Sequence, residues 1–212
     1  MNSFQEQLER KLNDEVEWRI SEMSSLKLIL HIGNMGEEKK GLLKKYSIPA
    51  FYSIWEGYVV RALEEYINMV NSMGLSFNEI HPYLITHDID MKQGLKDGRV
   101  NLNTKVDFCR EIKTYFEAPL SISTRIPTKS NVNFKVINNI LVNLNLEKLD
   151  ERRYKHKLTK LVKYRNDIAH GENSLLVDDD IYLELYETVI MCMDGLTDIL
   201  IEGISNNKYR AS

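Results

Sequence analysis

Apolar residues recur at a helical spacing through most of the chain, and this periodicity restricts the fold more than any other feature. The first helical stripe, between about Phe4 and Ile32, consists of Leu8, Leu12, Val16, Ile20, Met23, Leu26, Ile29 and Leu30. A helix with such a stripe must bury it against other elements. The pattern therefore predicts an all-α protein built as a helical bundle.

The same periodicity predicts further helices at about 44–73, 133–144, 150–170 and 180–204, and one more from Asn103 or Thr104 through Phe116. The segment 44–73 is dense in apolar and aromatic residues, so we expect it to be the central helix of the bundle. Pro49 is expected either at its start or at a kink, because proline lacks a backbone N–H.

The middle of the chain, about residues 76–130, is less regular than the rest. Prolines and glycines interrupt it, and the alternation in Ser121–Ile126 favours an extended strand or strap. We expect this region to be an insertion or elaboration on the bundle. The whole chain, residues 1–212, is expected to form one helical domain.

Composition and simple motifs argue against several classes of protein, such as membrane proteins, but do not identify a function. The net charge of −3 gives no global sign of nucleic-acid affinity, so an anionic partner would have to be held by local charge. Cys109 and Cys192 lie apart in apolar surroundings and are expected to be reduced, buried thiols. No signal-peptide pattern, membrane-length apolar run or glycine-rich nucleotide loop is present, which favours a soluble, cytoplasmic protein with no cofactor.

The most chemically capable stretch is Tyr164–Glu172, which joins a basic helical segment to an acidic one. Arg165 carries a permanent charge on a planar fork of donors that suits phosphate oxygens. His170 can give and take protons near neutral pH. Asn166 shares a helical face with His170 and could orient its imidazole. Gly171 can adopt the left-handed conformation that ends a helix, which would leave His170 accessible.

Arg165 and His170 do not point at each other on one helix. At about 100° per residue they project roughly 140° apart. Two copies related by a two-fold axis could bring both pairs into one cleft. The spacing therefore favours a shared site in a homodimer over a site within one chain.

Other charged groups allow weaker interpretations. The segment 152–166 is basic and without acids, and Lys160 and Lys163 could form a track for phosphates leading to the site or simply be solvated. His81, His87, Asp88 and Asp90 match no standard metal-ligand spacing, so we predict no metal site there. Arg165 continues the apolar stripe of its helix and therefore needs a buried partner.

Arg165 to His170 resembles the Arg-x4–6-His motif of the HEPN superfamily, which comprises helical domains found in many ribonucleases of toxin–antitoxin and phage-defence systems. The aromatic segment Ile48–Tyr58, the segment Thr128–Asn133 and the sequence RNDIAHGE also look like stand-alone bacterial HEPN proteins. The resemblance covers roughly residues 10–204. Glu172 departs from a related branch, which carries a tyrosine two residues after the histidine as a target for modification.

The resemblance implies a HEPN-type bundle and a metal-independent endoribonuclease acting as a homodimer. Arg165 would bind the scissile phosphate, His170 would transfer protons, and Asn166 would orient His170 or the phosphate. Attack by the 2′-hydroxyl would leave a 2′,3′-cyclic phosphate. An antitoxin or defence partner protein would also be expected. The alternative is a non-catalytic helical interaction module in which the motif only builds a dimer interface.

Overall fold

The structure, a computed structural model, describes residues 3–32, 35–93, 101–117, 119–128, 131–172 and 175–211. In these ranges it contains α-helices, one π-helical turn and an isolated bridge between Ile80 and Arg210, with no β-strand. The α-helices are α1 (Ser3–Ile29), α2 (Glu37–Ser72), α3 (Pro82–Gln93), α4 (Leu102–Thr114), α5 (Phe134–Asn143), α6 (His156–Ala169) and α7 (Asp179–Ser205). The π-helical turn η1 (Glu151–Lys155) leads directly into α6. The prediction of an all-α fold is confirmed.

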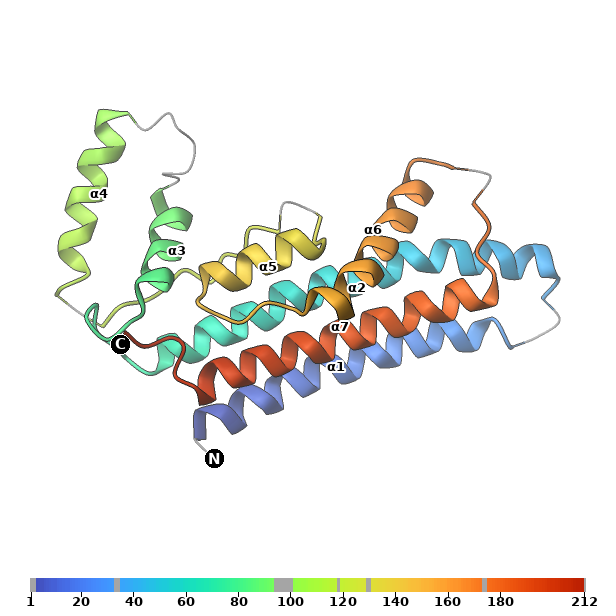
Figure 1. Ribbon diagram of the computed structural model, residues 1–212, viewed down its shortest axis with the longest axis horizontal. Helices are drawn as coiled ribbons and strands as arrows, with labels where there is room; N and C mark the ends of the chain where they lie inside the picture. The colour runs from blue at the N-terminus through green and yellow to red at the C-terminus, as the bar shows by residue number, and fades with distance from the viewer. Residues whose placement is uncertain are drawn as a thin grey trace.

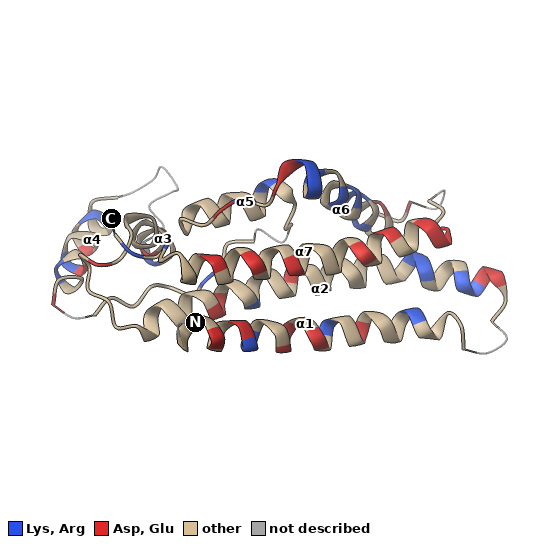
Figure 2. Cartoon of the chain, turned by 60° about the horizontal axis from the view of Figure 1, so that its bottom comes forward, with Lys and Arg blue, Asp and Glu red and all other residues tan. Residues whose placement is uncertain are grey.

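Three long helices, α1, α2 and α7, lie side by side and form the body of the molecule (Figure 1). Helices α5 and α6 lie on one side of this layer (Figure 2), and α6 packs across α2. Helix α2 supplies the largest buried side chains, including Phe51, Tyr52, Trp55, Tyr58 and Tyr66. The dense aromatic segment is thus the centre of the core, as its composition predicted.

The sequence misplaced the start of α2. The helix begins at Glu37 rather than near residue 44, and Pro49 lies inside it. Pro49 is therefore not at a helix start. The apolar stripe located the helix but missed its first two turns, because that part is rich in lysine and glutamate and contains only two large apolar residues, Leu42 and Leu43.

Helix α4 projects from one end of the body together with α3 (Figure 1). Its N-cap is Asn101, whose side chain accepts a hydrogen bond from the Thr104 backbone N–H at 2.9 Å. The predicted start at Asn103 or Thr104 was therefore too late in the chain. Cys109 on α4 is exposed, against expectation, whereas Cys192 on α7 is buried. Burial raises the pKa of the Cys192 thiol to about 12.

An extended strap, residues 119–128, connects α4 with the region of α5. Asn71 at the end of α2 clamps the strap: its amide donates to the Ile122 carbonyl and accepts from the Ile122 N–H, both at 2.8 Å. The predicted Ser121–Ile126 segment is therefore a strap, without strand pairing in the described residues.

Asp88 on α3 joins three segments at this end of the molecule. It is fully buried and accepts hydrogen bonds from the Tyr115 hydroxyl and the Ser123 N–H, both at 2.6 Å. Lys92 pairs with it at 2.8 Å. Its carboxylate oxygens are thus occupied by α3, the strap and the residue that ends α4. No group of three or more metal-ligating side chains occurs in the part of the chain that the structure describes.

The C-terminal residues return to this end of the body. The His81 N–H donates to the Tyr209 carbonyl at 2.7 Å, and the Ala211 N–H donates to the Glu79 carbonyl at 2.9 Å. These bonds join the residues that follow α7 to those that precede α3. None of the helices in the described ranges is long and apolar enough to cross a membrane.

Candidate functional site

Helix α6 carries the motif, and its two ends are fixed by different means. Asp150 caps η1 by accepting a hydrogen bond from the Arg153 N–H at 2.8 Å. At the other end, Gly171 adopts φ +80°, the Gly171 N–H donates to the Ile168 carbonyl, and the Glu172 N–H donates to the Asp167 carbonyl. These two bonds form a Schellman motif, in which glycine at the left-handed position ends the helix. The predicted role of Gly171 is confirmed.

The inner face of α6 consists of Leu158, Leu161, Val162 and Ile168, all of which are buried. Arg165 lies between these residues and is half-buried. Its guanidinium carbon lies 4.5 Å from the centre of the Tyr52 ring on α2. A guanidinium over an aromatic face is held by the ring quadrupole and by stacking. The partner that the sequence required for Arg165 is therefore an aromatic ring.

Arg165 forms no ion pair within the described ranges. Its Nη1 donates to the Asn166 Oδ1 at 2.8 Å, so its contacts are a neutral amide and a neutral ring. Neither partner cancels the positive charge. An arginine that is positioned but not neutralised by a carboxylate keeps its charge for an external anion.

Tyr52 forms the platform under Arg165. The sequence did not indicate this role, because a tyrosine in a dense apolar segment is expected simply to pack in the core. Only 1% of its surface is exposed, and its hydroxyl accepts a hydrogen bond from the Val132 N–H at 2.7 Å. Burial raises the pKa of the Tyr52 hydroxyl, the Glu56 carboxylate raises it further, and the Val132 N–H and Arg165 oppose the rise. Tyr52 therefore stays neutral at physiological pH and connects α2, α6 and the segment before α5.

His170 caps the C-terminal end of α6 and is exposed. Its backbone N–H donates to the Asn166 carbonyl at 2.9 Å. Arg165 faces α2 while the His170 imidazole is open to solvent, as their angular separation on the helix predicted. The Asn166 side chain accepts a hydrogen bond from Arg165, a contact outside the two roles expected for this amide. Orienting His170 or the phosphate stays a prediction.

The two lysines predicted to bind RNA lie in different surroundings. Lys160 pairs with Glu184 of α7 at 2.6 Å, whereas Lys163 is exposed and has no ion pair among the described residues. Lys45 of α2 donates to the Glu172 carbonyl at 2.6 Å, which ties the turn after His170 to the body. Lys163 therefore has the more available charge of the two, and the role of both stays a prediction.

Fold and site together define a class of protein: an all-helical domain with an Arg-x4-His motif at the C-terminal end of a short helix that crosses the longest one. A family model described as HEPN_MAE_28990-like HEPN matches residues 8–209. The chain belongs to this HEPN family. No curated protein and no solved structure matches the chain.

Proposed function

We propose that the protein is an endoribonuclease whose active site is assembled from Arg165, Asn166 and His170 of two chains. The observation that carries the proposal is the state of Arg165: it is positioned by Tyr52 and Asn166 and forms no ion pair in the described part of the chain. A phosphodiester supplies the anion that such a guanidinium can bind through two parallel hydrogen bonds.

RNA is the phosphodiester that this set of groups can cleave, because its own 2′-hydroxyl supplies the nucleophile. Arg165 binds a non-bridging phosphate oxygen and stabilises the charge that develops during attack. One His170 removes the 2′-hydroxyl proton, and a second His170 protonates the departing 5′-oxygen. The products are a 2′,3′-cyclic phosphate and a 5′-hydroxyl, and no step requires an activated water or a metal ion.

The need for two chains follows from the directions of the side chains. Arg165 faces α2 and His170 faces solvent at the end of the same helix. A two-fold axis beside this helix end would bring a second His170 toward the same phosphate. The homodimer, a cytoplasmic toxin or phage-defence role and a partner antitoxin belong to the same proposal, which HEPN membership supports.

The test is cleavage of a mixed-sequence single-stranded RNA by purified protein in excess EDTA. Wild type is expected to cut and to leave cyclic-phosphate ends. Arg165→Ala and His170→Ala are each expected to lose at least about 100-fold in rate, the usual effect of removing a proton-transfer or charge-stabilising group. Helicity and dimer mass are measured for every variant.

His156→Ala is the matched control, because His156 is exposed on the same helix and lies outside the motif. If the control and both motif variants all cut like wild type, the assignment of the site is wrong. If wild type is a folded dimer that does not cut RNA, the alternative of a non-catalytic interaction module replaces the proposal.

A further inference from the structure

A cleft away from the motif lies between α3, the strap and α5. It encloses about 390 Å³, and its lining consists of Met91, Pro127, Val136, Asn139, Ile140, Val142 and Asn143. Two amide side chains therefore stand among apolar ones. Asn139 and Asn143 are spaced i, i+4 on α5 and share a face of the helix. Apolar walls with a few amide groups suit the flat faces and polar edges of a nucleobase.

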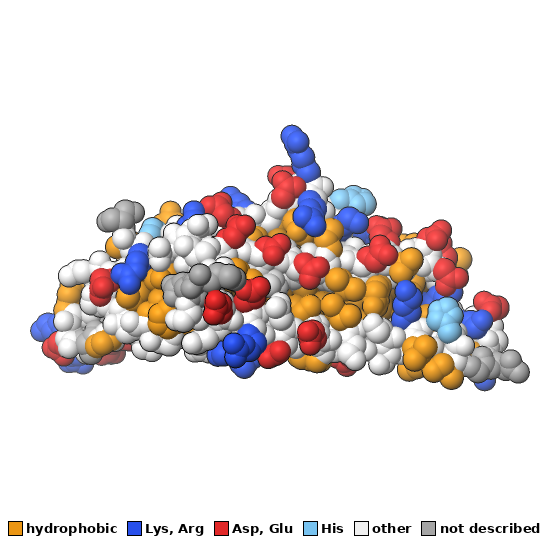
Figure 3. All heavy atoms as spheres, turned by 90° about the horizontal axis from the view of Figure 1, so that it is seen from below, with side chains coloured by type: hydrophobic (Ala, Val, Ile, Leu, Met, Phe, Trp, Pro, Cys, Tyr) orange, Lys and Arg blue, Asp and Glu red, His pale blue; other side chains and the backbone are white. Residues whose placement is uncertain are grey.

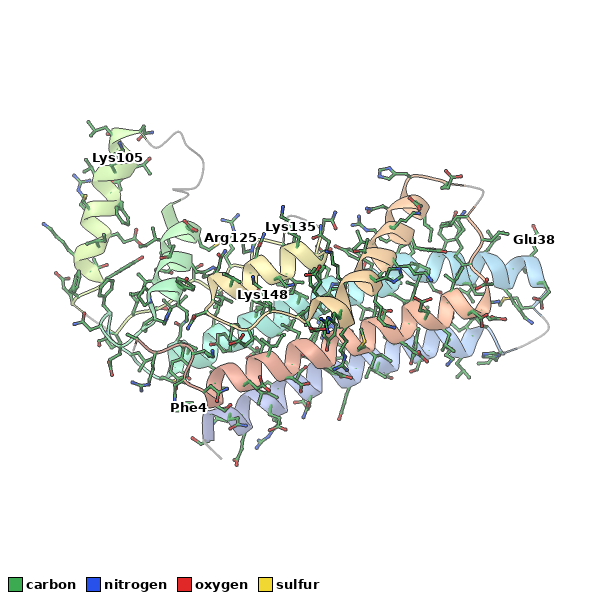
Figure 4. The ribbon with its side chains drawn as sticks, in the orientation of Figure 1. Phe4, Glu38, Lys105, Arg125, Lys135 and Lys148 are labelled. Atoms are coloured by element: carbon green, nitrogen blue, oxygen red, sulfur yellow. The ribbon has the colours of Figure 1, made fainter. Side chains whose placement is uncertain are left out.

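Two exposed cations lie beside this cleft. Arg125 precedes Pro127 in the strap, and Lys135 precedes Val136 in the first turn of α5. Both are at the same edge of the molecule, above α5 (Figure 4). Neither forms an ion pair with a residue in the described ranges, so both charges are available to phosphate groups.

The cleft is joined to Arg165 by a short run of backbone. The Val132 N–H bonds to the hydroxyl of Tyr52, whose ring carries the Arg165 guanidinium. Asn133 then caps α5, and Lys135 follows in its first turn. The segment that leads into α5 is thus bonded to the residue that holds Arg165, and Lys135 lies in the helical turn that follows it.

Local charge points to the same ligand. Residues 119–166 contain eleven lysines and arginines against three acids, although the whole chain has a net charge of −3. The face seen from below carries acidic side chains along its length, interspersed with lysines and arginines (Figure 3). A basic edge on an otherwise acidic protein attracts a polyanion locally and repels it elsewhere.

We infer that the cleft between α3, the strap and α5 is a second nucleotide-binding site for single-stranded RNA. Arg125 and Lys135 bind backbone phosphates, and a base enters the cleft and bonds to Asn139 and Asn143. The inference rests on the proposed function for its ligand, but it concerns binding rather than cleavage. A site beyond the scissile phosphate gives the enzyme affinity and base preference at a position that the motif does not contact.

The test uses the full chain with His170→Ala, so that binding is measured without cleavage. Fluorescence anisotropy with a labelled mixed-sequence single-stranded RNA gives affinity and its salt dependence. Arg125→Glu combined with Lys135→Glu is expected to weaken binding at least about tenfold. The slope of the logarithm of the binding constant against the logarithm of the salt concentration should fall in magnitude by about 1.4, because two phosphate contacts on a single strand are lost.

Two further variants separate the site from general charge. Arg10→Glu with Lys39→Glu makes the same charge change on exposed residues of α1 and α2, and it should change the affinity less than about twofold. Asn139→Leu with Asn143→Leu keeps the charge and is expected to weaken binding of RNA and flatten any base preference.

The outcomes differ from those of the cleavage assay. If wild type cuts RNA while the Arg125 and Lys135 variant binds as tightly as the control, this inference is wrong and the proposed function stands. If wild type never cuts RNA but binding depends on Arg125 and Lys135, the inference stands and the proposed function is wrong. If a polyglutamate peptide displaces the RNA and binds at the same cations with higher affinity, the edge is a docking site for an acidic protein, and the inference is overturned.

Discussion

At the scale of single residues, the site depends on how Arg165 is held. A carboxylate partner would position the guanidinium and also neutralise it. Tyr52 and Asn166 position it and leave its charge. The contact between a cation and an aromatic ring is worth about 0.5–2 kcal/mol, depending on how far the pair is removed from water. That free energy is small beside the stability of a domain, so its main consequence is the orientation of Arg165.

Substitutions at Tyr52 separate this role from stability. Tyr52→Phe keeps the ring but leaves the buried Val132 N–H without its acceptor, which should lower the free energy of unfolding by about 1–3 kcal/mol. Cleavage of RNA should be retained, because the platform remains. Tyr52→Leu removes the ring and should reduce cleavage about tenfold or more, measured at a temperature where both variants are folded.

Denaturant unfolding and the cleavage rate are measured on the same preparations of these two variants. Equal loss of activity in Tyr52→Phe and Tyr52→Leu would mean that the hydroxyl, rather than the ring, is what the site requires.

At the scale of elements, the end of α6 decides where His170 lies. The chain leaves the helix through Gly171 in the left-handed conformation, and the Lys45 side chain then binds the Glu172 carbonyl. The helix therefore stops directly after the histidine instead of burying it in another turn. The same arrangement exposes His170 at a point where a second chain can approach.

Gly171 is the residue at which this helix end can be tested. Gly171→Ala should lower the free energy of unfolding by about 1 kcal/mol, because a Cβ is disfavoured at positive φ. Gly171→Asn should cost less, since asparagine tolerates this conformation better than other residues. Thermal unfolding followed by circular dichroism measures both.

Among the described residues, apart from the two chain neighbours of Gly171, no atom lies within 4 Å of a Cβ built there, so a steric clash with them does not confound the comparison. If alanine and asparagine destabilise the protein equally, backbone conformation is not the reason for glycine at this position.

At the scale of the whole molecule, a charged network fastens α1 to α2. Arg19 is almost fully buried, stacks on the Trp18 ring at 4.2 Å and pairs with Glu15, which also accepts a hydrogen bond from Trp18. Arg61 of α2 reaches the same carboxylate at 3.4 Å. Burial alone would raise the pKa of Glu15, but the hydrogen bonds from Arg19 and Trp18 outweigh it and hold the pKa below the usual 4.5.

This shift gives a signed dependence of stability on pH. Because the pKa of Glu15 is lower in the folded chain, its ionised form stabilises the protein above pH 4.5, and the stabilisation is lost as pH falls through the folded value. Glu15→Gln should therefore lower the melting temperature at pH 7 and approach the wild-type value near pH 3. Glu17→Gln, on an exposed neighbour, is the control. A constant difference between wild type and Glu15→Gln at all pH values would contradict the assignment.

The sequence by itself determined most of the helices, the motif and the end of α6, but it did not predict α3 or the first turns of α2. Apolar spacing is a local property, so it predicted an all-α chain and the inward stripe of α6, and the glycine after His170 predicted where that helix stops. Local spacing cannot tell which helices cross. Only the tertiary structure decided that Tyr52 lies under Arg165, that Lys160 pairs with Glu184, and that Cys109 is exposed. Each of these features depends on how segments far apart in the chain pack or fail to pack. The spacing of apolar residues along one helix carries no information about that.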